Sequence, residues 1–365
     1  MKISVIGTRG IPDIQGGVET HCQELFPRLV KLGYEVTLFR RSGYTGNQKD
    51  ISIFRGVRLI DLYSPRIKSL EAIVHTFLAV LYSGLKRPDI LHIHAIGPSV
   101  LTPLAKLLGL KVVVTNHGSD YDRQKWGPFA KKVLKLGERW GSVYADKVIV
   151  ISKTIAGNIN KTYRRTDTVL IYNGVTIPVK SINTDYIASL KLERGKYILG
   201  IGRFVVEKGF HDLIEAYKHF EMKDYKLVLA GDADHETEYS KNLKDLALKN
   251  NVILTGFIKG ENLNQIYSNA RLFILPSYHE GLPISLLEAM SYNLDVLASD
   301  IPANKELDLE KDDYFSVGNI RELTNKITRK LETNKDRDFS GLLKTKYNWD
   351  TIAEQTSKVY FDVIK

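Results

Sequence analysis

The chain has 365 residues, of which 43% are hydrophobic and 26% charged, a composition typical of globular proteins. With roughly 100–200 residues per domain, this length predicts two domains. A net charge of +10 favours an anionic partner, such as a phosphate group, a nucleic acid or a membrane surface. The single cysteine, Cys22, excludes an internal disulfide framework.

No run of about 20 apolar residues predicts a transmembrane helix. The nearest candidate, Ser69–Leu85, carries Glu71 and His75 and is interpreted as an ordinary amphipathic helix. The apolar run at the N-terminus is too short for a signal peptide. We therefore expect a cytoplasmic protein.

Short β-branched and apolar runs alternate with longer helical segments along the chain. In the first half the predicted strands are Ile3–Gly7, Glu35–Arg40, Val57–Leu62, Ile90–His94, Val112–His117, Val148–Ser152 and Val169–Tyr172. In the second half they are Tyr197–Gly202, Leu227–Gly231, Val252–Gly256, Leu272–Pro276, Val296–Ser299 and Tyr314–Val317. Such alternation indicates parallel sheets covered on both faces. Two series predict an α/β protein with two doubly wound, Rossmann-like domains.

A turn and a proline in Asn173–Pro178 separate the two series. We predict an N-terminal domain over residues 1–173 and a second domain over 174–345. Apolar residues recur at helical spacing from Trp349 to Ile364, so residues 346–365 are predicted to form a terminal helix.

Parallel sheets bind ligands beyond the carboxyl ends of their strands. At one such end, Pro283 suits the first turn of a helix, and the amides of Gly281, Leu282 and Ile284 would form an anion site. Glu280 and Glu288 flank this site, where carboxylates accept hydrogen bonds from sugar and ribose hydroxyls. The alternative is a helix with ordinary surface acids.

Two other strand ends carry residues suited to phosphates. Gly202 and Arg203 end a predicted strand, and Lys208 precedes a helix, so the two cations could clamp a diphosphate. The alternative is solvated surface charge. Near the N-terminus a glycine-rich loop contains Gly16 and Gly17, which let a backbone approach a ligand closely. This loop matches neither the dinucleotide fingerprint nor a Walker loop, which argues against hydride and phosphoryl transfer.

Histidines occur on two neighbouring predicted strands. His92 and His94 share one face of a strand, but no Asp, Glu or Cys cluster accompanies them, so we expect no metal there. His117 ends the next strand and should face a ligand cleft, unless it is a buried structural histidine.

Five motifs in register resemble glycosyltransferase family 4, a family of retaining enzymes with the two-domain GT-B fold. They are Gly16-Gly17-Val18-Glu19, Asn173-Gly174-Val175, Gly202-Arg203 with Glu207-Lys208-Gly209, Ala230-Gly231-Asp232, and the pair Glu280 and Glu288. The resemblance implies two domains that face a cleft, with the terminal helix crossing back to the first domain.

The resemblance also implies roles for the matching positions. Arg203 and Lys208 would neutralise the donor's diphosphate, and Glu280 would contact the sugar. Glu288 would hold the ribose, and His117 would lie beside the anomeric carbon. The remaining donor-binding positions would be Gly16, Gly17, Gly202, Phe257, Ile258, Gly281, Leu282 and Pro283.

The segments Gly7–Pro12 and His117–Gly127 resemble a subgroup of bacterial surface-polysaccharide enzymes that includes rhamnosyltransferases. Ser119 departs from the leucine that is frequent there, which leaves the sugar open. The implied donor is dTDP-rhamnose or a UDP- or GDP-hexose. The implied acceptor is a glycan or lipid-linked glycan in capsule, O-antigen or exopolysaccharide synthesis.

The implied chemistry needs no metal or other cofactor, because Arg203 and Lys208 would stabilise the leaving diphosphate. The acceptor's proton would pass to the leaving phosphate. The sequence Asp232-Ala233-Asp234 resembles a metal motif of a different glycosyltransferase fold, but it follows a strand here, and we expect no metal chemistry from it.

Three alternatives stay open. The basic, aromatic stretch Arg123–Lys135 would suit peripheral contact with an anionic membrane, or it is an ordinary solvated helix. A GT-B scaffold also serves epimerases and phosphorylases. Nucleic-acid binding would explain the charge, but no binding-module motif is evident and the charges are scattered, so we expect no nucleic-acid partner.

Overall fold

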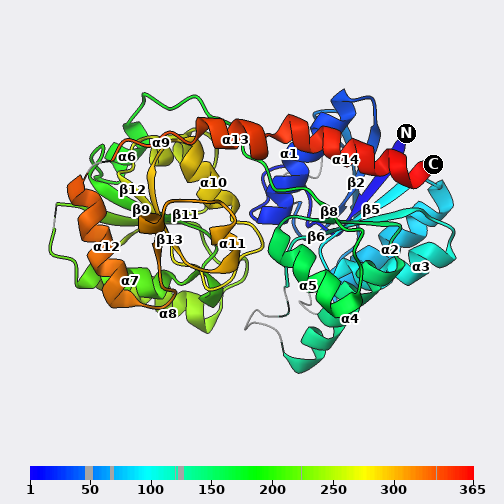
Figure 1. The fold of residues 1–365 in the computed structure, drawn as a ribbon, viewed down its shortest axis with the longest axis horizontal. Coiled ribbons are helices and arrows are strands. Elements are labelled where there is room, and N and C mark those ends of the chain that lie inside the picture. The colour runs from blue at the N-terminus through cyan, green and yellow to red at the C-terminus, as the bar shows by residue number, and fades with distance from the viewer. Residues whose placement is uncertain (46–51, 66–69, 120, 122–126, 223, 334) are drawn as a thin grey trace. The chain divides into compact units, whose positions relative to one another are not determined.

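The computed structural model describes residues 1–45, 52–65, 70–119, 121, 127–222, 224–333 and 335–365. The chain forms two compact units (Figure 1). Unit 1 comprises Met1–Gly174 together with Tyr347–Lys365, and unit 2 comprises Val175–Lys346. None of the described helices combines the length and the apolar character needed to cross a membrane.

Unit 1 is built on a mixed sheet in the order β3-β4-β2-β1-β5-β6-β7-β8. Its strands are β1 Lys2–Ile6, β2 Glu35–Arg41, β3 Ile53–Phe54, β4 Val57–Leu62, β5 Ile90–His94, β6 Val112–Asn116, β7 Lys147–Val150 and β8 Val169–Leu170. All neighbours pair in parallel except β3 and β4. The hairpin turn between these two is Arg55-Gly56, with positive φ at both residues, as two-residue hairpins favour.

Helices cover both faces of this sheet. They are α1 Gly17–Lys31, α2 Glu71–Lys86, α3 Thr102–Leu107, α4 Pro128–Tyr144, α5 Lys153–Tyr163 and α14 Trp349–Ile364, with a 3-10 turn, η2, at Pro98–Leu101. Helices α1 and α14 pack together on one face, and α2, α3, α4 and α5 follow one another on the other (Figure 1). Right-handed crossovers require this, because the chain moves in opposite directions across the sheet before and after β4.

The terminal helix α14 belongs to the core of unit 1. Trp349, Ile352 and Tyr360 are at most 3% exposed and share one apolar cluster with residues of β1 and α1. The Tyr360 hydroxyl lies 2.6 Å from Nδ1 of His92 on β5. At Gly174 a Cβ atom would lie 2.6 Å from the Trp349 ring, so only glycine fits against it. The terminal helix therefore completes the first unit, although the whole of unit 2 precedes it in the sequence.

Unit 2 holds a parallel sheet in the order β11-β10-β9-β12-β13-β14. Its strands are β9 Tyr197–Ile201, β10 Lys226–Ala230, β11 Ile253–Gly256, β12 Leu272–Leu275, β13 Asp295–Ser299 and β14 Tyr314–Phe315. Its helices are α6 Asp185–Ser189, α7 Phe210–Lys218, α8 Glu238–Lys249, α9 Gly260–Ser268, α10 Ile284–Ser291, α11 Pro302–Lys305, α12 Ile320–Thr333 and α13 Ser340–Lys346, with 3-10 turns η4 at Val206–Lys208 and η5 at Lys311–Asp313. The predicted class, two doubly wound α/β domains with a terminal helix returning to the first, is confirmed.

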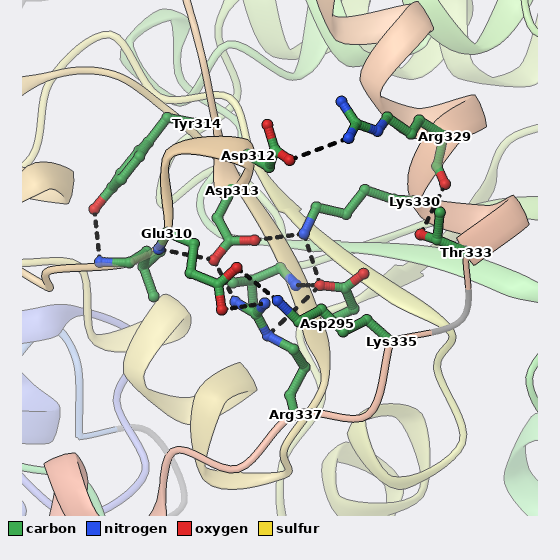
Figure 2. Close-up of polar contacts among 12 residues, drawn as sticks. Asp295, Glu310, Asp312, Asp313, Tyr314, Arg329, Lys330, Thr333, Lys335 and Arg337 are labelled. Atoms are coloured by element: carbon green, nitrogen blue, oxygen red, sulfur yellow. Dashed lines mark hydrogen bonds and ion pairs between the residues drawn. The ribbon is translucent and has the colours of Figure 1, made fainter.

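A buried cluster of charged residues joins α12 to the amino ends of the strands of this sheet (Figure 2). Lys330 Nζ lies 2.7 Å from Asp295 Oδ1 and 2.5 Å from Asp313 Oδ1. The Arg337 guanidinium bonds to the second carboxylate oxygen of Asp313. Side-chain exposure is 9% for Lys330 and 1% for each aspartate. These charges line a cavity of about 290 Å³ at the edge opposite the carboxyl ends of the strands, and we interpret them as a structural anchor.

We expect Lys330→Met to lower the free energy of unfolding by about 3–5 kcal/mol, because it leaves two buried carboxylates without their lysine partner. The measurement is urea unfolding followed by circular dichroism. Lys335→Met is the matched control: Lys335 lies in the same cluster, but its bond is to Glu310, which is 60% exposed. The control should stay within about 1 kcal/mol of wild type. Equal losses in both variants would contradict the anchoring role.

Candidate functional site

The candidate site of unit 2 lies where its sheet changes direction. From β9 the chain continues to β10 and β11 on one side, and then returns to β12 on the other side of β9. Neighbouring loops diverge at such a switch point and leave a crevice beyond the carboxyl ends of the two strands. The segments that follow β9 and β12 are those that carry most of the predicted donor-binding residues.

Lys208 and Glu280 meet at this point. Lys208 Nζ lies 2.6 Å from Glu280 Oε1, and Ser277 Oγ donates to the same oxygen at 2.6 Å. Side-chain exposure is 17% for Lys208 and 11% for Glu280. The pair is thus largely withdrawn from water but still reachable by a ligand.

Backbone contacts fix the two loops against each other. The Tyr278 amide donates to the Glu207 carbonyl at 2.8 Å. Gly209, at φ 65°, lies so close to the backbone after β12 that a Cβ atom would come 2.1 Å from the Pro276 oxygen. Glycine is therefore required beside Lys208, and the spacing of the Glu-Lys-Gly motif follows from this close approach.

Arg203, which follows β9 after Gly202, is oriented by the neighbouring loop. Its Nη1 lies 2.8 Å from Asp234 Oδ2, on the segment after β10. Asp232 Oδ1 in turn lies 2.7 Å from Lys244 Nζ of α8. Both aspartates of the Asp232-Ala233-Asp234 sequence are thus ion-paired within the chain.

The start of α10 supplies the predicted anion-binding amides. Pro283 is the N-cap residue, one position before the helix, whereas the sequence predicted it in the first turn; helix boundaries commonly shift by this much. Gly281 and Leu282 lead into it, and the Leu282 side chain is buried. The first turn of a helix leaves amides without partners inside the helix, which suits a phosphate.

Two aromatic residues orient the Glu288 side chain. Its Oε2 accepts a hydrogen bond from the Tyr267 hydroxyl at 2.9 Å. The Tyr267 ring stacks on Tyr292, with centroids 4.9 Å apart. Burial and the nearby Glu288 carboxylate raise the pKa of Tyr267 well above its usual value, so the phenol stays protonated and donates. Tyr267 carries no motif and was not predicted as a site residue.

Phe257 and Ile258 follow β11, the outer strand of the sheet, at the same carboxyl edge. Phe257 is 47% exposed and Ile258 is partly exposed. An exposed aromatic ring at this edge is available to a flat ligand group, such as a nucleobase.

In unit 1, Gly16 and Gly17 stand at the start of α1. Gly16 is the N-cap residue with φ 150°, and a Cβ atom there would lie 2.1 Å from Glu19 Oε2. Glu19 accepts bonds from the Arg9 backbone at 3.0 Å and from its Nε at 3.1 Å. Burial opposes ionisation of Glu19, but Arg9 outweighs it and lowers the pKa of Glu19. The sequence motifs contain both residues but did not predict that they pair, and this ion pair shapes the glycine loop.

His117 follows β6 and lies in a cluster of histidines. Its Nε2 is 3.0 Å from Nδ1 of His94, and its ring meets His21 edge-on at 5.0 Å. His21 is one turn into α1 from Gly17, and its Nδ1 lies 3.0 Å from the Asn173 side-chain oxygen. The structure therefore brings His117 next to the helix that the two glycines begin.

Burial keeps these histidines neutral. It lowers the pKa of His21 to about 4, although the hydrogen bond that His21 Nδ1 donates to the Asn173 side-chain oxygen acts to raise it. Burial and neighbouring histidines hold the pKa of His94 and of His117 well below the usual value. One ring nitrogen from each of the three lies within 4.8 Å of the others, so this group could hold a metal ion. His21 was not predicted as a site residue, because it lies far from His117 in the sequence.

Two family models together match most of the chain. The family model "Glycosyltransferase Family 4" matches residues 15–177, and "Glycosyl transferases group 1" matches residues 183–341. An uncharacterized glycosyltransferase of Methanocaldococcus jannaschii is 25% identical, over 99% of this chain and 98% of its own. An O-antigen chain mannosyltransferase of Salmonella typhimurium is 28% identical, over 55% of this chain and 58% of its own.

Solved structures share the fold across the whole chain. The sucrose-phosphate synthase of Thermosynechococcus elongatus has a TM-score of 0.83 and 22% identity, covering 99% of this chain and 98% of its own. Anabaena HepE, in complex with UDP-glucose, has a TM-score of 0.80 and 20% identity, covering 99% of this chain and all of its own.

We expect unit 1 to lose stability steeply below about pH 6.5, which is the pKa of a histidine in an unfolded chain. Burial lowers the pKa of His21 to about 4 and that of His92 to about 3, so the unfolded chain takes up these protons first. Stability is then full above about pH 6.5 and falls by up to about 1.4 kcal/mol per pH unit for each such histidine.

Tryptophan fluorescence during urea unfolding at stepped pH measures this, because all three tryptophans, Trp126, Trp140 and Trp349, lie outside Val175–Lys346. His92→Gln should reduce the slope by about one histidine's share. His219→Gln, in unit 2 and exposed, is the control and should leave the slope unchanged. If the slope is unchanged in His92→Gln, the loss of stability at low pH does not come from this buried histidine.

Proposed function

We propose that this glycosyltransferase moves a sugar from a nucleoside diphosphate donor to an acceptor hydroxyl with retention of the anomeric configuration. The observation that carries the proposal is the Lys208–Glu280 pair at the switch point of unit 2. An ammonium group beside the start of α10 suits a diphosphate, and a carboxylate next to it suits the hydroxyls of the attached sugar.

The departing diphosphate gains negative charge as the bond to the sugar breaks. Lys208, and Arg203 from the same loop, would stabilise that charge, which is why we expect the reaction to need no metal. Their carboxylate partners, Glu280 and Asp234, hold both cations in place beforehand. Gly202 between β9 and Arg203 leaves room for the phosphates.

The rest of the donor would lie along the same edge of the sheet. Glu288 would accept hydrogen bonds from the ribose, in an orientation that Tyr267 fixes. The segment Gly281–Pro283 would present its amides to the phosphates, and Phe257 with Ile258 would contact the base. In unit 1 we assign Gly16 and Gly17 to the sugar-phosphate.

His117 would lie beside the anomeric carbon as a neutral imidazole, positioned by His94 at 3.0 Å. We name no separate general base, because the acceptor's proton can pass to the leaving phosphate. The low pKa of His117 supports a role in hydrogen bonding to the sugar rather than in carrying charge.

The relatives support a role in polysaccharide synthesis. Among them are an O-antigen mannosyltransferase and an amylovoran biosynthesis glycosyltransferase of Erwinia amylovora. We therefore propose dTDP-rhamnose, or a UDP- or GDP-hexose, as donor, and a glycan or lipid-linked glycan as acceptor, at the cytoplasmic side of the membrane. A thermal-shift panel of nucleotide sugars would identify the donor, because a bound ligand stabilises the fold.

An epimerase or a phosphorylase would use the same cations differently. An epimerase would convert the nucleotide sugar without an acceptor, and a phosphorylase would release sugar phosphate. Chromatography of the products, with and without acceptor, separates the three reactions.

With the donor identified, Lys208→Ala should lower kcat/KM at least about 100-fold, because it removes a cation that acts on the leaving group. Lys218→Ala, a surface lysine of the same unit paired with Glu215, is the control and should retain full activity. Addition of a chelator should leave the wild-type rate unchanged. An enzyme that the chelator silences would count against metal-free catalysis.

A further inference from the structure

Three histidines meet at the switch point of the unit 1 sheet. The chain runs from β1 outward to β2 and β4, and it returns to β5 on the other side of β1. His94 is the last residue of β5, His117 follows β6, and His21 lies on α1, the helix that comes after β1. The group therefore lies near the carboxyl ends of the strands, where parallel sheets bind ligands.

The three rings have the spacing of ligands to one metal ion. Their centroids lie 5.5 Å apart for His21 and His94, 5.0 Å for His21 and His117, and 5.3 Å for His94 and His117. Three imidazoles on one tetrahedral ion, with metal–nitrogen bonds of about 2.0–2.1 Å, place their centroids about 5 Å apart. One nitrogen of each ring also lies within 4.8 Å of the other two.

Asn173 selects the tautomer of His21 that can bind a metal through Nε2. His21 Nδ1 donates to the Asn173 side-chain oxygen at 3.0 Å, so the single proton of the neutral ring is on Nδ1 and Nε2 carries a lone pair. Histidines that bind metals commonly donate their other nitrogen to an oxygen in this way, which fixes the ring and strengthens it as a ligand.

His94 and His117 already lie almost at the separation that a metal requires. His94 Nδ1 is 3.0 Å from His117 Nε2, and two nitrogens on one tetrahedral ion lie about 3.3 Å apart. The two neutral rings share one proton here, and an ion can replace it when the proton moves to the other nitrogen of its own ring. His94 Nε2 is buried without a hydrogen-bond partner, so contacts within the protein leave this side chain incompletely bonded.

His92 does not belong to the group, although the sequence places it on the same face as His94. Its Nδ1 and Nε2 bond to the hydroxyls of Tyr360 and Thr115 at 2.6 Å and 2.7 Å. The expectation of no metal near these two histidines rested on the lack of an accompanying Asp, Glu or Cys cluster. The fold supplies two histidines instead, from α1 and from the end of β6.

We propose that His21, His94 and His117 bind one Zn²⁺ ion. Imidazole nitrogens suit zinc, and three protein ligands leave the fourth position to water. The ion enters past His117, which is partly exposed, whereas the other two are buried. Beyond His117 the chain enters the basic stretch predicted to contact membranes, Arg123–Lys135, of which Arg123–Trp126 lie outside the described residues.

Zinc at this site would inhibit the proposed transferase. The ion occupies a nitrogen of His117, the imidazole that we assign to the anomeric carbon. The zinc-free form is therefore the active one, and the transfer itself uses no metal. This consequence rests on the proposed function, whereas the zinc site rests on the three histidines alone.

Equilibrium dialysis of the whole chain against Zn²⁺, without a nucleotide sugar, tests the proposal. We expect one Zn²⁺ per chain, and Co²⁺ in its place should give the visible absorption of a tetrahedral complex. His117→Gln should lower the affinity for Zn²⁺ at least about 100-fold, because it removes a direct ligand. His75→Gln is the matched control: His75 is buried in the same unit but lies outside the group, so this variant should bind zinc like wild type.

A second variant separates coordination from a merely structural role. Asn173→Asp should tighten zinc binding by about tenfold, because a carboxylate accepts more strongly from His21 Nδ1 and makes Nε2 a better ligand. Urea unfolding followed by tryptophan fluorescence checks that each variant folds. Three results would overturn the proposal: no zinc bound by the wild type, equal losses of affinity in His117→Gln and His75→Gln, or weaker binding by a folded Asn173→Asp. Since no sugar transfer is measured, these outcomes are independent of the proposed reaction.

Discussion

The ion pair between Lys208 and Glu280 joins the two loops on which the candidate donor site depends. Each loop starts where a strand of a parallel sheet ends, and the two strands are neighbours. The pair, the shared bond from Ser277 and the close approach of Gly209 to Pro276 hold these loops in one arrangement. Cations fixed before a substrate arrives lose little further freedom when it binds, which is the condition for effective electrostatic stabilisation.

Ion pairs between a lysine and carboxylates occur at both ends of the strands of the unit 2 sheet. At the amino edge, Lys330 and its aspartates are at most 9% exposed, and their bonds are made within the protein. At the carboxyl edge, Lys208 and Glu280 are 17% and 11% exposed, so an incoming phosphate can share the ammonium group. The lysine at the carboxyl ends of the strands is thus the more exposed of the two, as a site that exchanges partners requires.

The fold followed from the sequence because most strands of the two covered sheets are near-continuous apolar runs. Each predicted strand is present. Among the strands of the described residues only β3 had no signal, since its two residues form by way of the Arg55-Gly56 turn. That Lys208 and Glu280 lie close together could also be predicted from the sequence, because parallel strands place their carboxyl ends on the same side of the sheet. The contacts of Tyr267 with Glu288 and of His21 with His117 could not be predicted, since they depend on packing between segments that are distant in the sequence.

Helix α2 shows a further limit of periodicity. Apolar residues occur on more than one side of it, so the spacing predicts a helix without saying which side is buried. Arg41 and Tyr44 decide this by binding Glu71 from within the unit. Which side of α2 is buried therefore depends on the tertiary contacts of a buried acid, which a single sequence does not reveal.

The place of α14 in the core of unit 1 governs the order in which the chain can mature on the ribosome. Val175–Lys346 emerges in full before Trp349, Ile352 and Tyr360 are made. Unit 2 can therefore fold during synthesis, whereas unit 1 must wait with the apolar side of α1 uncovered. Translation of unit 1 thus begins before that of unit 2 and is completed after it, and in the cell this interval is when unit 1 is most open to chaperones and to aggregation.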